Sequence, residues 1–244
     1  MRWLRTLILF DKGNIADSSD WQSLHEAYVR AIGRVEHPTG SGKLKLRRKA
    51  RLPSGQWNRN GVTPLKEQFL RSMKDDEYWQ LEGAFDITAS TRATRIRLYP
   101  NMTPHKEPIT SEFGAFDFIS TARLGTRAAI EWETGNISSS HRSMNKLAIA
   151  LAARKIQAGV LILPSRDLYE HLTDRIGNIG ELSPYLGMWS GLSSKVKRGL
   201  LAVTVVEHDE LTNDKTHPYL KSGTDGRFRE GQRKRGIGTE PSER

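Results

Sequence analysis

The sequence predicts an α/β fold in which a central mixed β-sheet is flanked by helices on both sides. Predicted strands and helices alternate along the chain, an order typical of such sheets. Residues 160–163 and 200–206 are continuous apolar runs, as expected for strands that are buried on both faces. The chain contains no internal repeat of roughly 20 to 50 residues, which argues against a solenoid or a propeller.

The first half of the chain contains two predicted helices and three predicted strands. Residues 3–10 predict a strand, and apolar residues at helical spacing predict a helix over 20–32 that ends at Gly33. Residues 64–73 predict a second helix, because a proline stands in the first turn and the apolar side chains share one face. Two further strands are predicted around Phe116 and Ile130.

The second half continues the alternation. Residues 142–158 predict a long helix, since their apolar side chains form a stripe and Gly159 follows as a stop signal. The remaining predicted elements are a strand over 160–163, a helix over 166–176 and a strand over 200–206.

Length and composition predict the domain organisation. At roughly 150 residues per domain, 244 residues correspond to one large domain or two small ones. From Lys221 onward, glycines and charged residues replace apolar ones, with seven basic and four acidic side chains. We therefore predict a single domain over residues 1–220, followed by a flexible basic tail over residues 221–244.

The composition excludes several classes of protein. The absence of cysteine rules out disulfide frameworks, thiolate zinc sites and cysteine nucleophiles. The longest apolar run, residues 147–153, is far shorter than the roughly 20 residues that span a bilayer. The amino-terminal segment lacks the cleavage site of a signal peptide, so we expect a cytoplasmic protein.

The charge favours a polyanionic partner. Lysine and arginine number 38 against 28 acidic residues, which gives a net charge of +10. Between His37 and Lys66 there are eight basic residues and no acidic one. The run at residues 43–51 is either a positive binding surface or a solvated, mobile loop, and the sequence leaves both interpretations open.

Three carboxylates are candidates for catalysis. Residues two apart on a strand share a face, so Glu131 and Glu133 point together while Ile130 and Trp132 face the core. Asp117 on an adjacent strand would join them. Three close carboxylates repel one another unless a cation neutralises them, and a hard divalent ion such as Mg²⁺ suits oxygen ligands. The alternative is that the two glutamates form the solvated face of an edge strand.

The sequence around these glutamates resembles a known family. Residues 131–146 read EWETGNISSSHRSMNK, which resembles the active-site strand and following helix of the BamHI family of type II restriction endonucleases, in the PD-(D/E)xK nuclease superfamily. The resemblance implies a restriction-endonuclease-like fold. It covers most of the chain from about residue 57, whereas the first 50 residues and residues 187–196 match poorly. Further matching segments, in the same order, are residues 60–67, 82–87, 172–178, 181–186 and, weakly, 224–226.

The resemblance implies a role for four acidic residues. Asp117 and Glu131 correspond to the metal ligands, and Glu82 corresponds to a further acidic residue at the metal site. Glu133 stands where most of the superfamily has lysine, and the resemblance implies that this glutamate helps to activate the attacking water. Phe116 replaces the proline of the superfamily motif, and the connection from Asp117 to Glu131 is shorter than in the family.

The resemblance also implies which residues read DNA. Asn136, Ser138 and Arg142 correspond to residues that enter the major groove, although residues 138–140 also suit an ordinary helix N-cap. Asp174 and Arg175 correspond to the pair that reads the outer bases, with a surface ion pair as the alternative.

Two further contacts with DNA rest on shorter matches. Asp225 corresponds to a carboxy-terminal residue near the minor groove. Lys66 is a candidate phosphate contact, with an ordinary helix-face lysine as the alternative.

The resemblance therefore implies a Mg²⁺-dependent type II endonuclease that cuts double-stranded DNA at GGATCC after the first G. A palindromic site implies a homodimer. The host would need a cognate DNA methyltransferase to protect its own DNA, although not as a physical partner. The alternatives are a superfamily nuclease with another target, or a DNA-binding protein that has lost catalysis.

Overall fold

The computed structural model describes residues 1–76, 80–81, 83, 97, 99–101, 114–173 and 176–221. Its centre is a six-stranded mixed sheet made of β1 (Arg2–Lys12), β5 (Gln80–Leu81), β6 (Phe118–Thr121), β7 (Arg127–Trp132), β8 (Ala158–Pro164) and β9 (Gly199–Glu207). The spatial order is β1-β9-β8-β7-β6-β5. Strands β7, β8 and β9 run parallel, β1 and β6 pair antiparallel with β9 and β7, and β5 pairs antiparallel with β6. The carboxyl ends of the three parallel strands therefore lie at one edge of the sheet.

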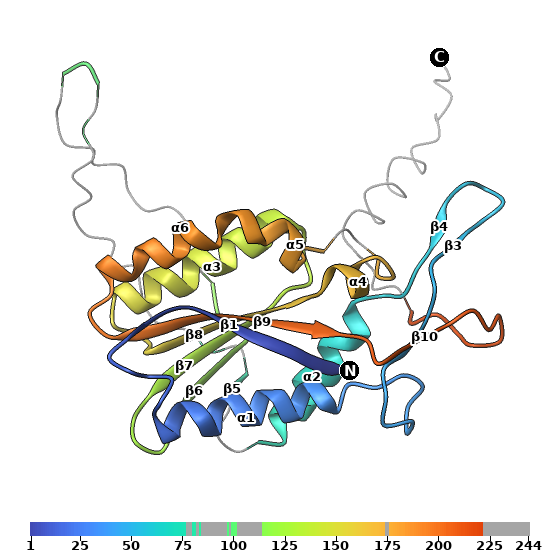
Figure 1. The fold of residues 1–244 in the computed structure, drawn as a ribbon, viewed down its shortest axis with the longest axis horizontal. Helices are drawn as coiled ribbons and strands as arrows, with labels where there is room; N and C mark the ends of the chain where they lie inside the picture. Colours follow the sequence, from blue (N-terminus) through green and yellow to red (C-terminus); the bar gives the residue numbers. More distant parts are fainter. Residues whose placement is uncertain are drawn as a thin grey trace, which may run out of the picture.

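Helices cover both faces of this sheet, as Figure 1 shows. The helices are α1 (Ser19–Gly33), α2 (Thr63–Lys74), α3 (Ile137–Ala152), α4 (Arg166–Tyr169), α5 (Ile179–Leu182) and α6 (Leu186–Gly191), with 3₁₀ turns at Ser183–Tyr185 and Leu192–Lys195. Helices α1 and α2 pack on one face, and α3 and α6 pack on the other (Figure 1). The predicted α/β fold with a mixed sheet between two helical layers is confirmed.

The alternation of side chains along the central strands builds two cores. On β7, Ile130 and Trp132 pack with Phe69 of α2, and the ring centroids of Phe69 and Trp132 lie 4.4 Å apart. Ala129 faces the other way, in the core that contains Leu147 of α3 and Trp189 of α6. Strand β7 is therefore buried on both faces, between β8 and β6.

The long helix lies earlier in the chain than predicted. The predicted range was 142–158, but α3 spans Ile137–Ala152, because Asn136 caps its first turn and Arg154 adopts a positive φ of 59° just after its end. Gly159 is not a stop signal but lies within β8. A Cβ atom there would approach Leu147 to 3.3 Å, so the glycine allows α3 to pack closely on the strand.

The predicted helix over 166–176 is also wrong, because α4 ends at Tyr169. The chain then forms an isolated parallel bridge between Leu172 and Asn60. Gly33 is the last residue of α1 rather than its cap. The other predicted helices and strands are found, with their ends shifted by a few residues.

Two small sheets lie outside the central one. β2 (Lys45–Arg47) pairs parallel with β10 (Glu210–Thr212), and β3 (Ala50–Arg51) pairs antiparallel with β4 (Trp57–Asn58). Two or three residues are too few for a periodic pattern, so the sequence did not predict these strands.

No helix within the described ranges has the length and apolar character needed to cross a membrane.

Candidate active site

Two of the predicted catalytic carboxylates, Asp117 and Glu131, lie close to each other at the carboxyl end of β7. Glu131 lies in the strand, and Glu133 follows it with its backbone N–H donating to Ile162 O at 2.9 Å. Both glutamates are buried, with 7% and 4% of their surface exposed. Because β7 is an inner strand, the interpretation of these residues as the solvated face of an edge strand is wrong.

Asp117 lies immediately before β6 and is fixed from two sides. Its Oδ2 accepts the backbone N–H of Trp132 at 2.8 Å, which ties the aspartate to the end of β7. Its Oδ1 lies 2.8 Å from Nζ of Lys66 on α2. Lys66 therefore points into the acidic cluster, next to Asp117, and not freely outward from its helix.

Glu131 forms a buried ion pair with Lys146 of α3. The Lys146 ammonium also donates to Ala115 O at 2.8 Å and lies 4.4 Å from the centre of the Phe116 ring. Burial raises the pKa of Glu131 to about 7, with Asp117 adding to the rise and Lys146 opposing it. The carboxylate therefore lies in a place where additional positive charge is favourable.

Glu133 has one satisfied and one unsatisfied oxygen. Oε1 accepts the N–H of Gly135 at 2.6 Å, whereas Oε2 is buried without a hydrogen-bond partner among the described residues. Burial raises the pKa of this carboxyl, against the opposing effect of the nearby Ser140 hydroxyl and backbone N–H groups. The turn needs glycine at position 135, because a Cβ atom would lie 2.4 Å from Oγ of Ser139.

The chemistry of these donors fits a hard divalent cation. Asp117 and Glu131 offer carboxylate oxygens, and the ammonium group paired with each shows that positive charge is favourable beside them. The described residues alone do not bring three acidic or histidine side chains into metal-ligand geometry.

The predicted base-reading residues that the structure describes lie at the start of α3. Asn136 caps this helix, and its Oδ1 accepts the N–H groups of Ser138 at 3.0 Å and Ser139 at 3.3 Å. The cap is therefore Asn136, not one of residues 138–140. Asn136, Ser138 and Arg142 are all exposed at this end of the helix, directly after β7.

Four predicted site residues, Glu82, Asp174, Arg175 and Asp225, lie outside the described residues, as do residues 222–244 of the predicted tail. Their described neighbours give some context. Leu81, just before Glu82, pairs with Phe118, just after Asp117. Thr173, just before Asp174, donates its N–H to Asn60 O at 2.7 Å.

Sequence reasoning missed Lys146 and Asn60. Lys146 lies on the apolar stripe of α3 beside Leu147, and a lysine on a buried helical face is a signal that could have identified it. Asn60 is fully buried, and its Nδ2 donates to Arg47 O at 2.8 Å and to His171 O at 3.0 Å. No sequence pattern marks such long-range contacts.

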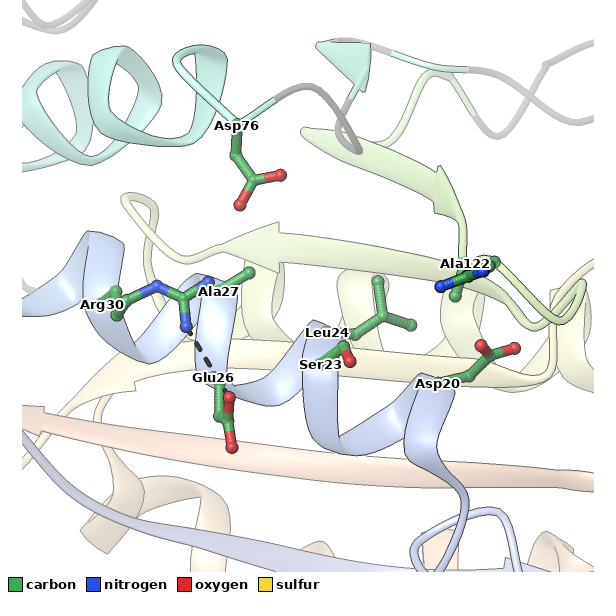
Figure 2. Close-up of a pocket in the computed structure, with 9 residues that line it drawn as sticks. Asp20, Ser23, Leu24, Glu26, Ala27, Arg30, Asp76 and Ala122 are labelled. Atoms are coloured by element: carbon green, nitrogen blue, oxygen red, sulfur yellow. Dashed lines mark ion pairs between the residues drawn. The ribbon is translucent and has the colours of Figure 1, made fainter.

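A separate cleft of about 310 Å³ lies between α1, the end of α2 and the turn that joins β6 to β7 (Figure 2). Asp20 on its wall accepts the backbone N–H groups of Leu124 at 2.9 Å and Thr126 at 3.0 Å. This turn precedes β7, so the cleft lies at the sheet edge opposite to Glu131 and Glu133. It contains none of the predicted site residues.

A mixed sheet with buried acidic residues at the end of a central strand, next to an exposed helix start, defines a restriction-endonuclease-like nuclease. The crystal structure of restriction endonuclease BglII complexed with a DNA 16-mer has the same fold, with a TM-score of 0.51, 10% identity and coverage of 91% of this chain and 90% of that one. The family model for restriction endonuclease BamHI matches residues 1–227, and the chain belongs to this family.

Two relatives are similar in sequence. The type II restriction enzyme OkrAI of Oceanobacter kriegii is 39% identical over 169 residues, which are 69% of this chain and 73% of that enzyme. The type II restriction enzyme BamHI of Bacillus amyloliquefaciens is 35% identical over 136 residues, which are 55% of this chain and 56% of that enzyme. The chain is therefore a restriction enzyme, and the expected DNA-hydrolysing class is confirmed.

Proposed function

We propose that this restriction endonuclease is Mg²⁺-dependent and cuts the palindrome GGATCC after the first G. One observation carries the proposal: Asp117 and Glu131 lie together at the end of β7, and the chain runs on from there through Glu133 to the exposed helix start that holds Asn136 and Arg142. Catalytic and base-reading groups thus lie on one continuous segment. The chain's resemblance to type II restriction enzymes supports the same reading.

Asp117 and Glu131 would hold the metal, with Glu82 as a further acidic residue at the site. A divalent ion bound there supplies positive charge for the attacking and leaving oxygens of the phosphodiester. Glu133 has a free, buried Oε2 and a raised pKa, which suit it to accept a hydrogen bond or a proton from the attacking water. Lys146 keeps Glu131 oriented through their ion pair.

DNA recognition is assigned to two sets of residues. Asn136, Ser138 and Arg142 would reach base edges in the major groove, and Asp174 with Arg175 would read the outer bases. The fork of an arginine pairs with O6 and N7 of guanine. The remaining contacts assigned to DNA are Lys66 to phosphate and Asp225 near the minor groove.

A palindrome is read best by two identical subunits, so the enzyme would act as a homodimer. Each subunit would place one set of carboxylates at one strand of the duplex. A cognate DNA methyltransferase in the host would protect the same sequence.

Digestion of a sequenced plasmid that contains several GGATCC sites tests the proposal. Discrete cuts after the first G, only when Mg²⁺ is present, are expected. Cuts at another sequence would refute the base-reading assignments and keep the active site. Binding to the site without any cutting would identify a DNA-binding protein that has lost catalysis.

The variant Glu131→Ala separates chemistry from binding. It should abolish cleavage while leaving binding to a GGATCC duplex largely intact, since Glu131 is assigned to the metal and not to a base. Full cleavage by this variant would show that the catalytic site is assigned wrongly.

A further inference from the structure

The segment 48–59 forms a basic β-hairpin, which we call the arm. Ala50 pairs with Asn58 and Arg51 with Trp57, and the turn between them is closed by Leu52 N–H donating to Gln56 O at 2.7 Å. In Figure 1 this hairpin stands away from the central sheet, beside α4. The arm contains four basic residues and no acidic one, namely Arg48, Lys49, Arg51 and Arg59.

The root of the arm is held firmly to the body. Arg48 N–H donates to Thr212 O at 2.9 Å, and its carbonyl accepts the hydroxyl of Tyr219 at 2.8 Å. Nζ of Lys49 lies 3.0 Å from Oε2 of Glu170. At the other end, Asn60 connects the arm to the backbone of His171. Such anchoring at both ends argues against the mobile-loop interpretation of this basic run.

The arm starts at the edge of the sheet that carries the catalytic site. Its root contacts residues 170–173, which follow the carboxyl end of β8, and residue 212, which follows the carboxyl end of β9. Thr173, hydrogen-bonded to Asn60, directly precedes Asp174 and Arg175, the proposed readers of the outer bases. The arm therefore begins where the protein would contact the end of the recognition sequence.

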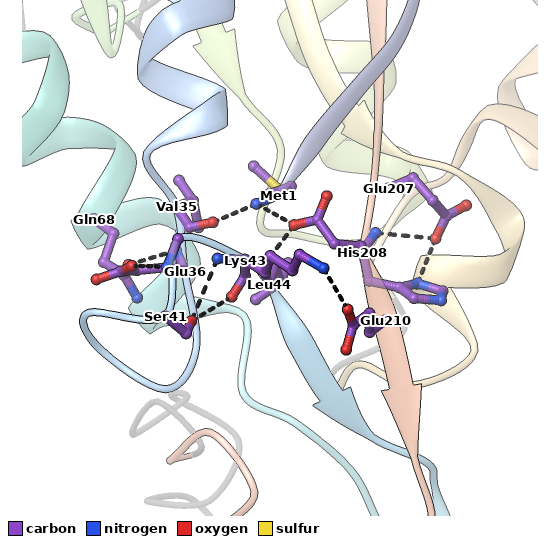
Figure 3. A network of polar contacts seen from close by, with 12 residues as sticks. Met1, Val35, Glu36, Ser41, Lys43, Leu44, Gln68, Glu207, His208 and Glu210 are labelled. Atoms are coloured by element: carbon purple, nitrogen blue, oxygen red, sulfur yellow. Dashed lines mark hydrogen bonds and ion pairs between the residues drawn. The ribbon is translucent and has the colours of Figure 1, made fainter.

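Several basic side chains near the arm already have partners within the protein. Lys43 pairs with Glu210 at 2.7 Å, as Figure 3 shows, and Lys45 lies 3.9 Å from the same carboxylate. Arg47 lies over the ring of Tyr219, and Lys49 pairs with Glu170. These contacts hold the four side chains against the protein surface.

Arg48 and Arg51, unlike Lys43 and Lys49, have no acidic partner among the described residues. Both side chains are exposed, and neither forms an ion pair with another described residue. Arg59 is partly buried, and its Nε has no hydrogen-bond partner among the described residues. Trp57 adds an apolar surface that is 50% exposed, with Nζ of Lys49 5.6 Å from its ring centre. Unpaired guanidinium groups beside an exposed aromatic ring are suited to a sugar–phosphate backbone.

The length of the arm sets how far it can reach. Five residues from root to turn, at roughly 3.3 Å per residue, give a reach of about 17 Å. A DNA duplex rises by about 3.4 Å per base pair. The arm can therefore extend over about five base pairs.

We propose that the arm binds the phosphate backbone of the duplex just outside the recognition sequence, through Arg48 and Arg51. This inference rests on the proposed function, because it takes double-stranded DNA as the substrate. It assigns the arm to affinity and not to sequence reading, since phosphate contacts carry no base information.

The test compares Arg48→Gln/Arg51→Gln with the matched control Lys195→Gln/Lys197→Gln. The control removes the same charge from exposed residues just before β9, at the opposite edge of the sheet. Binding is measured without Mg²⁺ at several salt concentrations, on three duplexes: GGATCC with two flanking base pairs, GGATCC with ten, and a scrambled site with ten.

The binding affinity of the arm variant should depend less steeply on salt than that of wild type, and only for the duplexes with long flanks. Each lost phosphate contact reduces the steepness of the plot of log K against log salt concentration by about 0.9. A dimer has two arms with two substituted arginines each, so its slope should become shallower by about 3.6. Between 50 and 200 mM salt, wild type should then lose roughly a hundredfold more affinity than the arm variant. The control should behave like wild type, and all three proteins should melt at the same temperature.

Two results would overturn the proposal. One is an unchanged salt slope for the arm variant on the long duplexes, which would point to an acidic protein partner instead. The other is an equal loss on short and long flanks, which would place the contacts within the site. If wild type binds GGATCC and the scrambled site equally well, the proposed sequence specificity is refuted. The proposal for the arm is still tested in that case, because its phosphate contacts can be measured on the scrambled duplex.

Discussion

The buried pair of Glu131 and Lys146 gives the sharpest test of how the site is held together. The change is Lys146→Met, which keeps most of the side-chain volume and removes the charge. It leaves Glu131 buried without its ammonium partner and Ala115 O without its donor. Removing one member of a buried ion pair costs about 3 to 5 kcal/mol, so a loss of about 3 kcal/mol in the free energy of unfolding is expected at pH 8.

The size of this loss should depend on pH. Burial raises the pKa of Glu131 to about 7 in the folded protein, whereas the unfolded chain keeps the ordinary glutamate pKa of 4.5. Folding therefore binds a proton between these values, so the stability linked to this group is present below pH 4.5 and is lost as pH rises through 7. Without Lys146 the folded pKa rises further. The deficit of the variant should shrink by about 1.4 kcal/mol between pH 8 and pH 6, because the wild-type carboxyl takes up its proton over this one pKa unit while that of the variant is already neutral.

The assay is urea unfolding in EDTA, at one protein concentration because a dimer's stability depends on it. Wild type, Lys146→Met, Glu131→Gln and the double variant form a cycle, and a coupling of about 1 to 3 kcal/mol is expected. The partly exposed pair Lys49–Glu170 is the matched control, for which the coupling should stay below about 1 kcal/mol. The reasoning would be refuted if the losses of unfolding free energy in the two single variants added up to that of the double variant. It would also be refuted if the loss of stability in Lys146→Met did not vary with pH.

Three further outcomes are expected. Asn60→Ala should lower the free energy of unfolding by about 2 to 4 kcal/mol, because two backbone carbonyls lose a buried donor; urea unfolding measures it, and a loss below about 0.5 kcal/mol would contradict it. Asp20 is buried, which raises its pKa, but two backbone N–H groups and the Thr126 hydroxyl outweigh this and lower it. Its stabilisation is therefore present above pH 3.8 and lost as pH falls, so Asp20→Asn should be less stable than wild type at pH 6 and equal to it at pH 2 in thermal melts. Arg142→Ala should reduce discrimination against a changed guanine by about 1 to 3 kcal/mol in competition binding, and unaltered discrimination would remove Arg142 from the base readers.

The sequence predicted the parts of the molecule that depend on local patterns. The apolar runs that became β8 and β9 and the helical spacing of α1 and α2 are visible over a few residues. The candidate carboxylates were predicted for two reasons. Alternation on a strand and a neighbouring predicted strand suggested Glu131, Glu133 and Asp117, and the family resemblance then implied their roles.

The elements that were predicted wrongly depend on contacts between distant residues. Residues 170–176 have the composition of a helix, yet His171 and Thr173 give their backbone groups to Asn60, more than a hundred residues earlier. A strand-like bridge formed across such a distance outweighs a small helix propensity, which is below about 0.7 kcal/mol per residue. Lys146 was missed for a similar reason, since its partner lies on another element.

The same long-range contacts connect the arm to the catalytic site. Asn60 accepts the N–H of Thr173, stands one residue after the arm, and lies six residues before Lys66, which holds Asp117. Asn60 therefore connects the arm both to residue 173, through a backbone hydrogen bond, and to the start of α2, along the chain. If phosphate binding by the arm only added affinity, Arg48→Gln/Arg51→Gln would weaken binding and leave the cleavage rate at saturating DNA unchanged. If the rigid root also positions Lys66, the same variant should lower that rate, while Lys195→Gln/Lys197→Gln should not. Single-turnover cleavage at saturating enzyme distinguishes the two cases.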